Sequence, residues 1–300
     1  MAATNRSWGR FAVAAVPYAW LLVFFLVPFF IVLKISLSTT EIAQPPYTPV
    51  IDGLADLFEK ASEFTADNYR RLVQESIYVE SYGSSLFIAG ISTLLMLLIG
   101  YPIAYAMARA PKAIRPTLLM FIILPFWTSF LIRVYAWIGI LSQEGLLNQF
   151  LLKLGLIDEP LAILSTNTAV YIGIVYSYLP FMVLPLYAAL EKMDETLLEA
   201  AQDLGCTPLQ TFWRITFPLS LPGVVAGSFL VFIPAVGEFV IPDLLGGSDT
   251  VMIGKTLWEE FFNNRDWPAA SAVAVTLLIF LVVPIVIFQH NQAKLQEAGR

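Results

Sequence analysis

Two ionisable residues lie inside long apolar runs of the sequence, Arg133 and Glu238. A charge within the hydrocarbon core of a membrane is costly, and such residues usually pair or mark a solute path. At the rise of an α-helix, Glu238 lies about 6 Å and Arg133 about 10 Å below the same end of their runs. Two interpretations stay open. Either Glu238 attracts a cationic solute, or the two side chains form a structural pair or extend to the lipid headgroups.

Aromatic residues on neighbouring runs add to the chemistry that a cation would meet. The faces of aromatic rings attract ammonium groups, and Pro234 frees backbone carbonyls near Glu238 as further acceptors. Single aromatic residues at this depth are also typical of the interfacial belt or of packing. These residues are therefore candidates for a cation path, and Arg133 is a candidate intramembrane partner of the Glu238 carboxylate, while the structural interpretation stays open. The residues assigned to this path are Glu238, Tyr135, Trp137, Tyr176, Tyr178 and Asp243.

Catalytic and metal-binding constellations are missing from the sequence. The segment MIGKT (252–256) ends like a phosphate-binding loop, but that motif needs a glycine at position 249, which is Asp249. The single histidine, His290, and the single cysteine, Cys206, provide no multi-residue metal site. We therefore predict a chain that is not an enzyme, holds no metal and binds no cofactor itself, with Cys206 serving only in packing.

The composition places these residues on membrane helices. Of the 300 residues, 58% are hydrophobic and 13% charged, whereas a soluble domain carries about 25% charged residues. A spanning helix needs about 20 apolar residues, and the first run is too long for a cleaved signal peptide. The predicted fold class is an all-α polytopic membrane protein with six transmembrane helices. The six runs are 13–33, 84–107, 117–140, 169–190, 220–242 and 269–289.

Charge in the loops predicts the orientation of the chain. The linker RAPKAIRP (109–116) carries Arg109, Lys112 and Arg115 and no acid, so the positive-inside rule makes it cytoplasmic. Both termini are then cytoplasmic, and Arg6, Arg10, Lys294 and Arg300 agree. The outer loops 37–83, 141–168 and 243–268 hold 16 of the 23 acids. This balance favours a cationic solute, and the lack of a basic patch excludes nucleic acid.

The predicted organisation has four parts. They are an N-terminal tail with an accessory first helix (1–36), an external loop (37–83), a core membrane domain (84–289) with a cytoplasmic hairpin at 194–218, and a cytoplasmic tail (290–300).

Local signals predict that the segment 194–218 forms two capped helices. Asp194 is suited to N-cap a first helix, and Gly205 to end it in the left-handed conformation. Thr207, Pro208 and Gln210 then form a capping box with proline at the first helical position. We expect Pro218 and Pro222 to end this second helix before the fifth span. Its apolar stripe of Leu209, Phe212, Trp213 and Phe217 suits either docking into a groove or lying on the membrane.

The same segment resembles the membrane subunits of binding-protein-dependent ABC importers. Their signature, E-A-A-x3-G-x9-I-x-L-P, is met in all but one place, because Phe217 stands where leucine is usual. The resemblance implies the type I importer permease fold and a loop that docks into a separate ATPase subunit, which uses ATP and Mg. The residues assigned to this coupling loop are Glu199, Ala200, Ala201, Gly205, Leu209, Phe212, Ile215 and Pro218.

Further segments resemble the polyamine branch of this family, and most closely its putrescine permeases. They are LPFWTSFLIRVYAWIGIL (124–141), VYIGIVYSYLPFMVLPLY (170–187), FIPAVGEFVIPDLLGG (232–247) and EEFFNNRDWPAASA (259–272). The resemblance implies import of putrescine, spermidine or both across the bacterial inner membrane. It also implies a second permease, two copies of an ATPase subunit, an extracytoplasmic polyamine-binding protein and a lipid environment as partners. The alternatives are a permease for another small solute, a secondary transporter that works alone, and a membrane receptor or scaffold.

Overall fold

The computed structural model describes residues 5–298 apart from 52, 54, 55, 57 and 58. Arg300 lies outside the described residues, as do the side chains of Arg6, Arg10, His290 and Lys294. The chain forms two compact units, one made of residues 1–79 and 257–300 and the other of residues 80–256.

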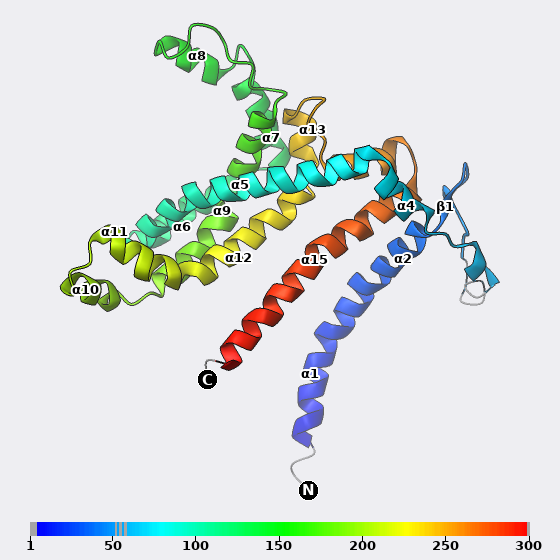
Figure 1. The fold of residues 1–300 in the computed structure, drawn as a ribbon, viewed down its shortest axis with the longest axis horizontal. Coiled ribbons are helices and arrows are strands. Elements are labelled where there is room, and N and C mark those ends of the chain that lie inside the picture. The colour runs from blue at the N-terminus through cyan, green and yellow to red at the C-terminus, as the bar shows by residue number, and fades with distance from the viewer. Residues whose placement is uncertain (1–4, 52, 54–55, 57–58, 299–300) are drawn as a thin grey trace. The chain divides into compact units, whose positions relative to one another are not determined.

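In the first unit, the second half of the N-terminal helical stretch and the first loop pack against the last helix (Figure 1). Helix α15 contacts α2, α4 and β1, and the two short strands pair antiparallel with Thr39 opposite Thr48. Its elements are α1 (Asn5–Leu21), a π-helical turn (Leu22–Leu26), α2 (Val27–Ser36), β1 (Thr39–Thr40), β2 (Tyr47–Thr48), a 3-10 turn (Ala61–Glu63), α4 (Asp67–Gln74), a second π-helical turn (Glu259–Asn263) and α15 (Trp267–Ala298).

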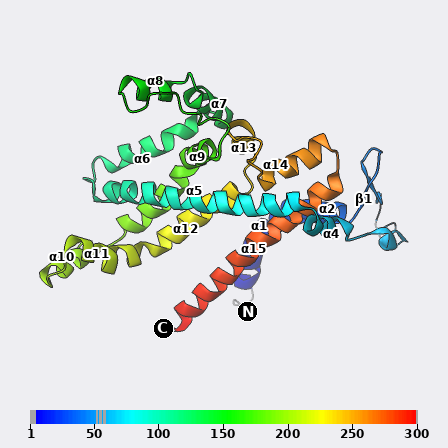
Figure 2. The ribbon, with the colours of Figure 1, turned by 45° about the horizontal axis from the view of Figure 1, so that its top comes forward.

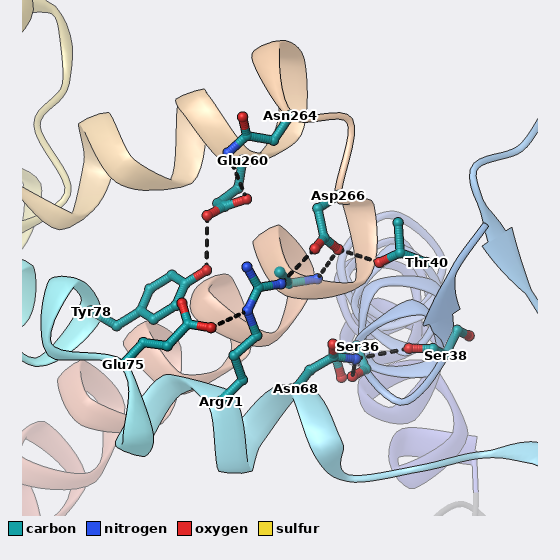
Figure 3. Close-up of polar contacts among 11 residues, drawn as sticks. Ser36, Ser38, Thr40, Asn68, Arg71, Glu75, Tyr78, Glu260, Asn264 and Asp266 are labelled. Atoms are coloured by element: carbon teal, nitrogen blue, oxygen red, sulfur yellow. Dashed lines mark hydrogen bonds and ion pairs between the residues drawn. The ribbon is translucent and has the colours of Figure 1, made fainter. Parts of the chain in front are cut away.

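A polar network joins the first predicted outer loop to the start of α15 (Figure 3). Arg71 bonds Glu75 at 2.8 Å and Asp266 at 2.7 Å, and Asp266 also accepts a hydrogen bond from Thr40. Burial lowers the pKa of Arg71, but the hydrogen bonds to Glu75 and Asp266 outweigh it and raise this pKa above its ordinary value. The carboxylate of Asp266 is therefore part of the packed unit and not a solvated loop charge.

The second unit is a helical bundle in which α9 and α12 lie side by side in both views (Figures 1 and 2). Glycines permit this approach, because a Cβ at Gly227 would lie 2.9 Å from the sulfur of Met182. Its elements are α5 (Ser76–Arg109), α6 (Arg115–Ile123), a 3-10 turn (Leu124–Trp127), α7 (Phe130–Leu141), α8 (Leu146–Lys153), α9 (Asn167–Glu191), α10 (Thr196–Asp203), α11 (Pro208–Thr211), a π-helical turn (Phe212–Thr216), α12 (Phe217–Val236), α13 (Val240–Leu245) and α14 (Ile253–Trp258).

The predicted spans are confirmed in part. Within the described part of the chain, five helical stretches are long and apolar enough to cross a membrane: Val13–Ser36, Ser76–Arg109, Phe130–Lys153, Asn167–Glu191 and Pro208–Val236. The continuous third span predicted at 117–140 is wrong, because the helix breaks between Ile123 and Phe130, where Pro125 provides no backbone N–H. The sixth run lies in α15, in which the described side chains form an apolar stretch at Trp267–Val283. The count of six and the placement of the termini stay predictions.

Candidate coupling loop and solute path

The first helix of the hairpin is α10, and it ends as the sequence predicts. Gly205 has φ +84° and donates its N–H to the carbonyl of Gln202 at 2.8 Å. At the other end, Asp194 accepts the N–H of Thr196 at 3.0 Å, and this bond lowers the pKa of the Asp194 carboxyl. Asp194 therefore serves the start of the helix from one position before the N-cap residue, Glu195.

The second helix of the hairpin begins as predicted but does not end at the prolines. Thr207 and Gln210 form both hydrogen bonds of the capping box. Instead of stopping at Pro218 or Pro222, α11 continues through a π-helical turn into α12. In the wide turn, the N–H of Phe217 bonds to the carbonyl of Phe212. Pro218 follows directly, at the start of the next helix, where its missing N–H removes no regular α-helical hydrogen bond.

The predicted aromatic stripe is divided between two faces. Leu209 and Trp213 are exposed, at 68% and 57%, whereas Phe212 and Phe217 pack against Tyr101 with ring centroids 5.5 and 6.1 Å apart. Phe212 is therefore half-buried against α5 and is not part of the exposed surface that we expected. Of the remaining coupling-loop residues, Glu199, Ala200, Gly205 and Pro218 are exposed, Ile215 is half-buried and Ala201 is buried.

Glu238 lies at the opposite end of α12, where the helix stops before α13 begins. Its carboxylate accepts the backbone N–H groups of Phe239, Val240 and Ile241 at 3.1, 3.0 and 3.4 Å, and the hydroxyl of Tyr178 donates to its other oxygen. Only 6% of Glu238 is exposed. The negative charge therefore meets the positive end of a short helix, and both carboxylate oxygens have partners.

A glycine on α14 makes room for this turn. A Cβ at Gly254 would lie 2.4 Å from the carbonyl oxygen of Gly237 and 2.6 Å from that of Glu238. The segment that resembles a phosphate-binding loop thus has a packing function here. Lys255 beside it pairs with Asp243 at 3.6 Å, so the acid expected at the outer mouth bonds a lysine of this same segment.

Arg133 does not pair with Glu238 among the described residues, which corrects the predicted partnership. Its guanidinium lies 5.1 Å from the ring centre of Phe126 and 5.8 Å from that of Phe130. Its Nε and Nη1 atoms are buried without hydrogen-bond partners. The ring of Phe126 contacts that of Phe181, with centroids 5.2 Å apart, and Phe181 contacts Tyr178 at 6.2 Å. Arg133 is therefore linked to the Glu238 turn through aromatic side chains and not by a direct bond.

The other aromatic candidates lie apart from Glu238. Trp137 and Tyr176 meet edge to face at 5.3 Å and line an apolar pocket of about 440 Å³ between α5, α7 and α9. Tyr135 is 58% exposed and lies outside this pocket. We did not predict the pocket, although residues 168, 171, 172, 175 and 176 follow the spacing of one helix face.

Comparison with known proteins agrees with this architecture. Over 225 residues the chain is 49% identical to the spermidine/putrescine transport system permease protein PotB of Salmonella typhimurium, covering 75% of this chain and 78% of the relative. Over 284 residues it is 39% identical to PotB of Haemophilus influenzae, covering 95% and 94%.

A solved bacterial ABC transporter involved in the import of the acidic polysaccharide alginate shares the fold, with a TM-score of 0.70 over 97% of this chain and 96% of that chain at 18% identity. This likeness confirms the permease fold and, at that identity, says nothing of the substrate. A family model matches residues 96–295. The chain thus belongs to the family of binding-protein-dependent transport system inner membrane components.

Proposed function

We propose that the chain is the permease subunit of an ABC importer for polyamines, putrescine and spermidine included, in the bacterial inner membrane. The main support for this proposal is the identity of the chain to a permease named for these solutes, which is 39% over 95% of the chain. The predicted outer loops hold most of the acids, and the negative charge of Glu238 lies at the hydroxyl of Tyr178. Both features suit a flexible cation with two or more ammonium groups.

The hairpin explains how an external ATPase would drive this permease. Because α11 runs into α12 without a break in the helix, a push on the exposed Leu209 and Trp213 would be carried along one continuous helical segment. The far end of that segment is the Gly237–Glu238 turn. An ATPase closing on the hairpin would therefore move the turn that holds the candidate solute carboxylate, which is the coupling that alternating access requires.

The proposal gives the chain no catalytic step of its own. A separate ATPase subunit in two copies would bind and hydrolyse ATP with Mg, a second permease would complete the pore, and a polyamine-binding protein would deliver the solute. Polar contacts in this chain serve instead to hold helices: Tyr101 and Ser220 share a hydrogen bond of 2.7 Å beneath the hairpin.

Transport by the reconstituted complex tests the proposal. The chain is purified with a second permease, an ATPase subunit and a polyamine-binding protein and placed in vesicles with ATP. We expect saturable uptake of labelled putrescine or spermidine that stops when the ATPase subunit is omitted. Uptake that persists without the ATPase contradicts the assignment to an ABC importer. ATP-driven uptake of an inorganic anion such as molybdate, but of neither polyamine, contradicts the proposed substrate.

A further inference from the structure

The linker between α5 and α6 grips the segment that leads into the coupling hairpin. Arg109, the last residue of α5, bonds Glu195 with 3.0 Å between Nη1 and Oε1. Arg115, the first residue of α6, bonds Glu191 at 3.4 Å. The two acids flank the short connection from α9 to α10, so one basic linker holds this connection at both ends.

The two arginines are fixed more firmly than the acids that they hold. Their side chains are 21% and 15% exposed, against 66% and 42% for Glu195 and Glu191. Arg115 also donates from Nε to the carbonyl of Ala110 at 2.8 Å, and the guanidinium of Arg109 lies 5.6 Å from the ring centre of Tyr105. The cations are thus anchored to α5 and to the linker, and the carboxylates dock onto them.

Arg109 depends on this contact for its hydrogen bonding. Its Nε and Nη2 atoms are buried without partners, and the bond from Nη1 to Glu195 is the one side-chain hydrogen bond that the described structure gives it. Loss of Glu195 would leave a half-buried cation without an acceptor, which is unfavourable. Separation of α10 from the α5–α6 linker is therefore opposed at this point.

We propose that Arg109 and Arg115 are positioning residues for energy coupling, which hold the base of the hairpin so that its displacement reaches α5 and α6. The proposal rests on the function proposed above. A push on α10 reaches the membrane helices by two routes: through α11 into α12, and through residues 191–195. Without the ion pairs the second route is only a short connection, and bending there would absorb the displacement.

A simpler interpretation gives the basic residues of this linker a role in orientation alone. Under the positive-inside rule, Arg109, Lys112 and Arg115 contribute equally. Lys112 lies in the same linker, is exposed, and forms no ion pair in the described structure. Lys112→Gln therefore removes the same charge from the same loop without breaking a contact, and it is the matched control.

The test compares ATP hydrolysis and polyamine uptake by the full reconstituted transporter. For Arg109→Gln combined with Arg115→Gln, we expect transport per ATP hydrolysed to fall about tenfold, within the usual range of coupling energies, while assembly and ATP hydrolysis change less than about twofold. Lys112→Gln should behave as the wild type. Exchanging the charges, with Arg109→Glu and Glu195→Arg, should restore at least half of the coupling lost in Arg109→Gln.

The outcomes separate the two proposals. Equal transport per ATP in the arginine variants and in Lys112→Gln overturns the positioning role, and so does a coupling defect that the charge exchange fails to repair. Absence of ATP-driven polyamine uptake in the wild-type complex instead contradicts the proposed function. If the double variant fails to assemble, the charge exchange decides the question, because it restores the ion pair within an assembled complex or shows that the pair does not matter.

Discussion

At the hairpin end of α12, a capped turn presents Leu209 and Trp213 to the exterior, and the chain passes through a π-helical turn into the helix. At the other end, the helix stops at Gly237 and a buried carboxylate takes four hydrogen bonds. The caps of the first end are bonds between residues a few positions apart, although its rings also pack on Tyr101 of α5. The second end adds to its local N–H bonds the Tyr178 hydroxyl of α9 and the close packing of Gly254 on α14, both distant in the sequence.

The two ends of α12 therefore tolerate different substitutions. A locally capped, exposed segment loses about 1 kcal/mol when one cap is removed, and its apolar surface remains available for a partner. A buried turn with every acceptor occupied has no alternative partners, so the loss of one contact leaves polar groups unsatisfied. Substitutions should therefore destabilise the Glu238 end and should uncouple, without unfolding, the hairpin end.

The largest effect is expected at Gly254. In Gly254→Val the side chain would overlap two carbonyl oxygens of the backbone, which cannot rotate away as a side chain would. We expect little folded protein, because overpacking of this kind costs about 1–3 kcal/mol or more. Thermal unfolding in detergent measures it. Gly139→Ala on α7, where a Cβ meets nothing within 4 Å, is the control and should unfold like the wild type.

Replacing Glu238 separates its charge from its hydrogen bonds. Glu238→Ala leaves three N–H groups and the Tyr178 hydroxyl without acceptors, so we expect a loss of about 3 kcal/mol in stability. Glu238→Gln keeps an oxygen for the N–H groups, and it should abolish polyamine uptake while the complex still assembles. Uptake assays and size-exclusion chromatography measure the two effects. Unchanged uptake in an assembled Glu238→Gln transporter would remove this residue from the solute path.

The hairpin could be predicted from the sequence because its signals are local. The capping box of Thr207 and Gln210 and the left-handed Gly205 depend on residues within four positions. The continuation past Pro218 was missed because proline signals a helix end unless a wider turn compensates, and the sequence does not show which occurs.

The solute path was predicted less well because its contacts are tertiary. Depth along the spans placed Arg133 and Glu238 at similar levels but gave no rotation about the helix axes, so the aromatic rings between them were not foreseen. The bonding of Glu238 to the start of α13 requires the break at Gly237, which the apolar run conceals. The burial of Asp266 likewise depends on Arg71, almost two hundred positions away in the sequence.

At Gly205 the hairpin end can be altered without touching the core. Its φ of +84° disfavours residues with a Cβ, and β-branched residues most of all, while a Cβ there meets nothing within 4 Å. Gly205→Val should thus cost about 1–3 kcal/mol in local strain and disturb the angle between α10 and α11. We expect ATP hydrolysis to continue with reduced uptake. Gly205→Asn, which tolerates the left-handed region, should retain more of the coupling. Equal defects in the two variants would contradict a conformational cause.

The smallest effect is expected from the cap itself. Thr207→Ala removes the oxygen that accepts the N–H of Gln210, at a cost of about 1 kcal/mol. Because α11 continues into α12, fraying would be confined to the first turn, and the packing of Phe212 on Tyr101 should hold the remainder. Thermal unfolding should shift by a few degrees at most, whereas amide hydrogen exchange should rise at Leu209 and Gln210, since Pro208 has no N–H. Thr207→Ser keeps the hydroxyl. If its hydrogen exchange rose as much as that of Thr207→Ala, the methyl group and not the cap would be what stabilises this turn.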